Sequence, residues 1–157
     1  MRKLIITVML AIAGMASASA ENHFDAYRNK EYVEVVQISK AMLRLANPNL
    51  GVSPIGSISA LNLGDKLDNI EVLSVDGDMD IANKISKELD GIFSQKKGYE
   101  VLMAQSSGDD ESVKILFRKG KKGVSNEFVV INHDESDMQA VVLSGSFTLA
   151  DLPLSIK

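Results

Sequence analysis

The sequence predicts an α+β fold: an antiparallel-dominated sheet in the order β-α-β-α-β-β-β-β, with two helices packed on one face. Two segments with helical periodicity separate the first three predicted strands. The remainder of the chain alternates apolar and polar side chains between short turn sequences, a pattern typical of hairpins. Because such strands have one apolar face, we expect both helices to cover the same side of the sheet.

The first predicted strand covers residues 32–38, where valines alternate with a polar side chain. A helix follows, with Ser39 as its predicted N-cap. Pro48 ends this helix, because the residue before a proline is pushed out of the α-helical region. The apolar residues at helical spacing are Ile38, Ala41, Met42, Leu45 and Ala46.

Residues 47–64 are predicted to form an irregular loop, since they contain two prolines and three glycines. Loops of this length without regular structure are uncommon in small domains and often carry function. We therefore treat this segment as a candidate functional loop.

A second strand is predicted at residues 69–75, followed by a longer amphipathic helix that Gly98 would close. Its apolar face consists of Ile81, Ala82, Ile85, Leu89, Ile92 and Phe93. The opposite face carries charged side chains, so this helix should lie on the core with one side in water.

Four further strands complete the predicted fold as an antiparallel meander. They cover residues 99–106, 112–119, 124–131 and 138–147. Tight turns join the first three of these strands, and a polar stretch at 132–137 links the last two.

Residues 1–20 have the pattern of a cleavable signal peptide, which leaves 21–157 as a single domain. Arg2 and Lys3 precede a twelve-residue apolar run, and small residues at 18–20 place the cut after Ala20. No later apolar run reaches about 18 residues, so we expect no transmembrane segment after cleavage. The predicted location is the periplasm or the outer surface of a Gram-negative-type cell.

Composition narrows the classes of partner. Loss of the two basic residues of the leader takes the formal net charge from −4 to −6. Nucleic acids and anionic lipids attract basic surfaces, so neither is an expected partner. The chain has no cysteine, which excludes disulfides and a lipid-modified cysteine anchor. Its stability must therefore come from apolar packing.

Asp76, Asp78 and Asp80 are weak candidates for metal ligands. Alternate carboxylates begin the calcium loop of an EF-hand, but the glycine and glutamate needed later in that loop are replaced by Ile81 and Lys87. The other interpretation is a helix N-terminus, where aspartates cap free N–H groups. The two histidines, His23 and His133, lack zinc-ligand spacing, and we expect both in solvated, irregular segments.

No motif assigns a catalytic residue or a cofactor site. Four polar residues at predicted strand starts form a possible site at one end of the sheet: Tyr99, Glu100, Asn126 and Glu127. The alternative is that they are cross-strand pairs that set register. A basic cluster also marks one hairpin end, where it either seats an acidic partner or keeps the sheet edge soluble: Arg118, Lys119, Lys121 and Lys122.

Four stretches resemble a family of small exported proteins, mostly from Bacteroidetes, catalogued as domain of unknown function 4252. They are Ile38–Leu43, Gly98–Met103, Asn126–Ile131 and Leu143–Gly145. The resemblance covers most of residues 24–152 and is weakest across 47–64. It implies an envelope protein of the same architecture and supplies no active site to transfer.

Together these observations favour an exported, non-catalytic module that binds an envelope protein or a peptide, with strand addition at a sheet edge as its mode. Two alternatives stay open: a small periplasmic hydrolase or lipid or glycan binder, and a regulator of envelope stress. A deep apolar pocket with converging carboxylates would favour the hydrolase or small-molecule binder. A filled core with bare strand edges would favour the binding module.

Overall fold

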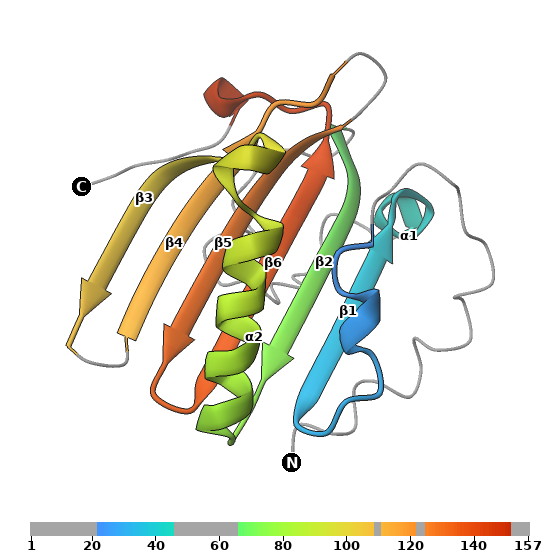
Figure 1. Cartoon of the computed structure of the whole chain (residues 1–157). Coiled ribbons are helices and arrows are strands. Elements are labelled where there is room, and N and C mark those ends of the chain that lie inside the picture. Colours follow the sequence, from blue (N-terminus) through green and yellow to red (C-terminus); the bar gives the residue numbers. More distant parts are fainter. Residues whose placement is uncertain (1–21, 46–65, 109–110, 122–124, 152–157) are drawn as a thin grey trace.

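A computed structural model describes residues 22–45, 66–108, 111–121 and 125–151. Its strands and helices follow the predicted order and confirm the α+β fold (Figure 1). The elements are β1 (Val33–Ser39), α1 (Lys40–Leu45), β2 (Leu67–Val75), α2 (Met79–Ile92), β3 (Glu100–Ser107), β4 (Glu111–Arg118), β5 (Asn126–Asp134) and β6 (Asp137–Gly145). Short 3-10 turns, η2 (Asp25–Tyr27), η5 (Gln95–Lys97) and η6 (Leu149–Asp151), flank them.

The strands form one six-stranded sheet in the order β1-β2-β6-β5-β4-β3, and each neighbouring pair is antiparallel. The C-terminal meander runs from β3 to β6, and β2 then pairs with β6, the last strand that the structure describes (Figure 1). This order places β1 and β3 at the two edges of the sheet.

Helix α2 lies across one face of the sheet (Figure 1). Its buried side chains, Ala82, Ile85 and Leu89, belong to the larger of two apolar clusters. Asp78 is the N-cap of this helix, and its side chain accepts a hydrogen bond from the Ile81 backbone N–H at 2.9 Å. This agrees with the second interpretation of the aspartates, as caps of a helix N-terminus.

The end of α2 differs from the prediction. The helix stops at Ile92, and a separate 3-10 turn, η5, follows before Gly98. Gly98 closes this turn with a φ of 92°, in the left-handed region where glycine has no steric penalty. The glycine signal was therefore a true stop signal, but for the short turn rather than for the helix.

Helix α1 begins directly after Ser39, whose Oγ accepts a hydrogen bond from the Met42 backbone N–H at 3.4 Å. This contact agrees with the predicted N-cap. The predicted leader at 1–20 and the predicted loop at 47–64 lie outside the described residues. Among the residues described, no helix is long and apolar enough to cross a bilayer.

The sheet departs from the expected one-sided pattern, because its central strands bury apolar side chains on both faces. In β6, Ala140 and Val142 join the cluster under α2, whereas Val141 and Leu143 join a second cluster on the opposite face. Consecutive residues of a strand point to opposite faces, so a continuous apolar run marks a strand buried on both sides. The second cluster comprises Val72, Phe117, Phe128, Val141, Leu143 and Phe147.

Strand β5 also extends further than predicted. It runs to Asp134 and pairs through His133 with Met138, so a two-residue turn at 135–136 replaces the predicted polar link at 132–137. His133 is consequently a buried strand residue, 7% exposed, and the expectation of a solvated histidine is wrong. Local polarity suggested a loop here, but pairing with β6 provides partners for the backbone.

Candidate functional site

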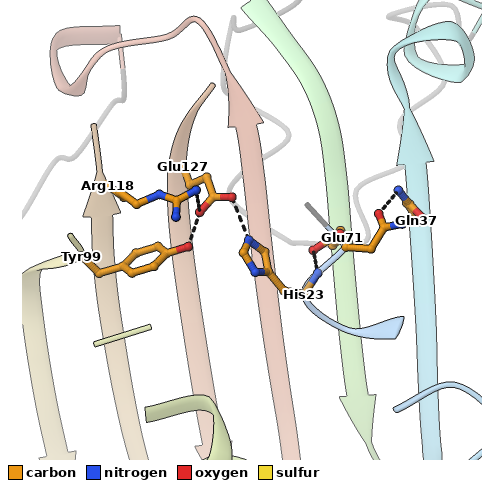
Figure 2. A network of polar contacts seen from close by, with 7 residues as sticks. His23, Gln37, Glu71, Tyr99, Arg118 and Glu127 are labelled. Carbon is orange, nitrogen blue, oxygen red and sulfur yellow. Dashed lines mark hydrogen bonds and ion pairs between the residues drawn. The ribbon is translucent and has the colours of Figure 1, made fainter. Parts of the chain in front are cut away.

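A cluster of buried and half-buried polar side chains lies at one end of the sheet, on the face that α2 covers (Figure 2). Glu71 comes from β2, Arg118 from β4 and Glu127 from β5, while Tyr99 directly precedes β3. His23 reaches the same place from the segment before η2 (Figure 2). The cluster therefore joins five separate parts of the chain.

Strand register explains why these residues share a face. Arg118 is paired with Glu127 across β4 and β5, and Glu127 is paired with Ser144 across β5 and β6. Ser144 in turn faces Asn69 in β2. Residues two positions apart along a strand point the same way, so Glu71 joins this row of side chains.

Glu127 is the centre of the cluster and is only 3% exposed. Its Oε1 atom lies 2.7 Å from His23 Nε2, and its Oε2 atom lies 3.0 Å from an Arg118 guanidinium nitrogen. The Tyr99 hydroxyl also donates to Oε2. A carboxylate buried in this way needs such donors, because an unpaired charge in the interior is strongly unfavourable.

These contacts set the ionisation of Glu127. Burial by itself raises the pKa of this carboxyl, but the hydrogen bonds from His23 and Tyr99 and the charge of Arg118 outweigh it and hold the pKa below its usual value. The ionised carboxylate only accepts hydrogen bonds, so the Nε2 atom of His23 carries the proton in this contact.

Aromatic rings enclose the cluster on its inner side. The His23 ring meets Phe93 edge-on with centroids 5.2 Å apart, and Tyr99 meets Phe93 in the same way at 5.1 Å. The Arg118 guanidinium stands 4.9 Å from the centroid of the Tyr99 ring. These contacts hold the polar groups in place beside the apolar core.

Glu71 is a second buried carboxyl, 2% exposed, with a different environment. It accepts a hydrogen bond from the His23 backbone N–H at 3.2 Å. Burial raises its pKa to about 7, although the nearby His23 partly opposes this change; Glu127 and Asp25 raise the pKa further. The two carboxyls therefore differ: Glu127 is compensated as an anion, whereas Glu71 is held towards its neutral form.

The cluster fastens the N-terminal segment to the sheet. His23 contacts both carboxyls, Phe24 is buried in the main apolar cluster, and the Tyr27 hydroxyl donates to Glu88 of α2 at 2.7 Å. Nearby, Gln37 of β1 donates to Asn22 at 2.6 Å. Carboxyl and imidazole groups, which can act in acid–base catalysis, meet here, and the two carboxyls are buried.

The structure brings together two of the four residues of the predicted polar site. Tyr99 and Glu127 meet in the cluster. Glu100 is exposed, and Asn126 points to the other face, where its amide donates to the Phe147 carbonyl and accepts from the Gly120 N–H. Neighbouring residues on a strand cannot share a face, which is why each predicted pair is split.

The structure also places the predicted aspartate metal-ligand candidates and the histidine His23. Asp78 caps α2, while Asp76 and Asp80 are exposed. Within the described ranges, no group of three or more histidine, aspartate or glutamate side chains is arranged to hold a metal ion. His23 was expected in a loose, solvated segment, and this is wrong because its side chain is 9% exposed and contacts Glu127 in the cluster.

Sequence reasoning missed His23, Glu71 and Arg118 as members of the cluster. For Glu71 a signal existed: it interrupts the apolar run of β2 between Ile70 and Val72. A charged residue within a strand that is buried on both faces requires a partner. His23 had no such signal, because its partner Glu127 lies 104 residues away in sequence.

A second feature, the outer edge of β3, is open. This strand pairs with β4 on one side, and no described strand pairs with its other side. Six of its eight residues are exposed, and its sequence from Val101 to Ser107 contains no charged residue. Natural sheets usually protect such edges with lysine, proline or a covering segment.

Two shallow grooves flank the C-terminal end of β3, away from the cluster. One, of about 370 Å³, is lined by residues that include Gln105, Ser107, Val113 and Asn132. The other, of about 270 Å³, separates this end of the sheet from α2 and is lined by residues that include Asn83, Lys87 and Ser106. Polar side chains predominate in the lining of both grooves.

The comparisons with known proteins give a family and no more. The family model described as Domain of unknown function (DUF4252) matches residues 27–154. Neither a curated protein nor a solved structure matches the chain.

Proposed function

The chain belongs to the DUF4252 family, and we propose that it is an exported, non-catalytic module that binds an extended peptide segment of an envelope partner by strand addition to β3. The observation that carries this proposal is the eight-residue edge strand, which has six exposed residues and no charge from Val101 to Ser107. In strand addition, main-chain hydrogen bonds supply affinity and side-chain pockets supply selectivity.

The opposite edge of the sheet supports the choice of β3. All seven residues of β1 are half-buried, and Glu34 adds a charge within the strand. The N-terminal segment lies against β1, where Arg28 donates to the Gln37 side chain at 3.2 Å. Strand β1 is therefore partly covered and carries a charge, whereas six of the eight residues of β3 are exposed.

The two grooves beside β3 extend the proposed surface. An added strand would direct alternate side chains to opposite faces of the sheet. One groove contacts the edge through Ser107 and the other through Ser106, consecutive residues that point to opposite faces. Both sets of peptide side chains would therefore meet a polar depression near this end of β3.

Export is part of the proposal and rests on the leader-like pattern of residues 1–20. We expect N-terminal sequencing of protein recovered from the periplasmic fraction to begin at Glu21. Recovery of the uncleaved chain from the cytoplasm would overturn this part of the proposal without affecting the binding mode.

A pair of proline variants tests strand addition: Ala104→Pro and Gln105→Pro. Consecutive strand residues direct their N–H groups to opposite edges, so one proline removes a bond to β4 and the other removes only an outward N–H. The variant that loses only an outward N–H keeps its bonds to β4, so a near-native melting temperature identifies it. We call it the outward proline variant. Both positions lie beyond the register shift between Val101 and Met103.

The binding readout uses a photo-crosslinking amino acid at Ser107, which is exposed, in the full chain expressed in cells. Lys84, exposed on α2, takes the same crosslinker as control. We expect one partner segment to be captured from Ser107, not from Lys84, and to be lost in the outward proline variant. No capture, or capture that survives this proline, would overturn the proposal.

A further inference from the structure

Four exposed lysines gather around the N-terminal end of β3. Lys96 and Lys97 belong to η5, directly before the strand, and Lys119 and Lys121 follow β4. The two segments meet at Gly98, where a Cβ atom would lie 3.6 Å from the Arg118 side chain. The edge strand therefore begins beside a local concentration of positive charge.

This concentration contrasts with the rest of the molecule and is not neutralised by its neighbours. The chain as a whole has 21 acidic and 17 basic residues. Arg118 is paired with the buried Glu127, but within the described ranges none of the four lysines forms an ion pair. Glu100 is the single acidic residue in the stretches 95–100 and 118–121. Unpaired lysines next to an open edge select for negative charge in a partner.

Resting on the proposed strand addition, we infer that the bound peptide runs antiparallel to β3 and carries acidic groups at its C-terminal end. Each pairing in the sheet is antiparallel, and antiparallel ladders are slightly more stable per residue. In that orientation the C-terminal end of the peptide lies beside the N-terminal end of β3. Acidic groups there meet the four lysines.

The test uses synthetic peptides with one core of eight alternating threonine and valine residues. One peptide ends in three glutamates, a second begins with three glutamates, and a third carries serines at both ends; all are acetylated and amidated. A fourth is the serine peptide with a free terminal carboxylate, which separates that group from acidic side chains. Binding to the full mature chain is measured by calorimetry at low and at physiological salt.

We expect the peptide with C-terminal glutamates to bind about fivefold more tightly than the serine peptide at low salt, from several weak exposed pairs acting together. The preference should shrink at higher salt, because exposed charges are screened. It should vanish in the Lys97→Glu, Lys119→Glu double variant. The matched control, Lys30→Glu with Lys84→Glu, makes the same charge change elsewhere on the exposed surface and should keep the preference.

The outcomes separate this inference from the proposed function. Equal binding of the acidic and serine peptides, or preference for N-terminal glutamates, overturns the inference while strand addition stands, provided that the outward proline abolishes binding. No binding by any peptide overturns both. Loss of the preference in the Lys30 and Lys84 control would assign the effect to net charge and also overturn the inference.

Discussion

The buried cluster around Glu127 and the open edge of β3 begin at neighbouring residues, yet they have opposite physical characters. Tyr99 is 2% exposed and donates to a buried carboxylate, whereas Glu100 is exposed at the first position of the edge strand. The cluster contains five polar residues that contact one another, while the edge offers main-chain groups that no described strand uses. The polar groups of the cluster thus contact one another inside the fold, whereas the edge of β3 is the surface on which the proposed strand addition depends.

The largest expected effect is on the cluster side. Glu127→Gln should lower the free energy of unfolding by about 3–5 kcal/mol, since it leaves the Arg118 charge and His23 without their carboxylate. Urea denaturation at pH 7 measures this change. Glu100→Gln, at an exposed position, serves as control and should stay within about 0.5 kcal/mol. A similar small loss for both variants would show that the cluster has no structural role.

Glu71, the second buried carboxyl, should lower the stability of the protein when it ionises, whereas the ionised Glu127 raises it. Because the folded-state pKa of Glu71 is raised from 4.5 to about 7, the folded protein holds this proton more tightly than the unfolded chain does. The wild type then loses stability as the pH rises from about 4.5 through 7, by up to about 3 kcal/mol at 1.36 kcal/mol per pKa unit.

Glu71→Gln removes that loss, because the amide keeps an acceptor for the His23 N–H and has no charge to bury. Relative to the wild type, the variant should gain stability at pH 8 and gain little at pH 4.5. Thermal unfolding across this range provides the measurement. A gain that is independent of pH would contradict the assignment of the effect to ionisation of Glu71.

A smaller loss of unfolding free energy is expected for Tyr99→Phe. This variant removes one hydrogen bond to the Glu127 carboxylate and keeps the ring packed on Phe93. Hydrogen bonds to charged groups contribute about 1.5–3 kcal/mol. The difference in unfolding free energy between the variant and the wild type should become smaller as the pH falls below the ordinary pKa of Glu127. Protonation there removes the carboxylate that Tyr99 contacts. Peptide binding by the folded fraction should be unchanged, which separates the cluster from the edge.

The smallest stability change is expected on the edge side. Ala104→Lys, at an exposed position of β3, should alter the free energy of unfolding by no more than about 0.5 kcal/mol. It should nevertheless reduce partner capture from Ser107, because an edge lysine is a natural defence against strand pairing. A large stability loss with unchanged capture would reverse the roles assigned to the two regions.

Much of the fold was predictable because its signals are local. The order of strands and helices and the cap at Asp78 follow from residue types a few positions apart, whereas Gly98 ends the short turn η5 and not the helix as predicted. The errors occurred where a non-local partner overrode local polarity. His133 looked like a loop residue until pairing with Met138 placed it in β5, and the two-sided burial of β6 depends on layers far away in sequence.

The candidate cluster was only half predictable. Tyr99 and Glu127 were singled out as polar residues in an apolar meander, but their companions Glu100 and Asn126 point elsewhere. Which member of each neighbouring pair faces inward depends on register, and one position of slip would exchange them.

The sequence by itself therefore determined the α+β class, the six strands and the absence of charge along Val101–Ser107, since periodicity and composition act over short distances. Only the tertiary structure decided that β2 pairs with β6, that His23 reaches Glu127 across 104 residues and that β3 is left at an open edge. Such long-range contacts form when the whole sheet closes its register and buries its faces, and no local pattern contains that information.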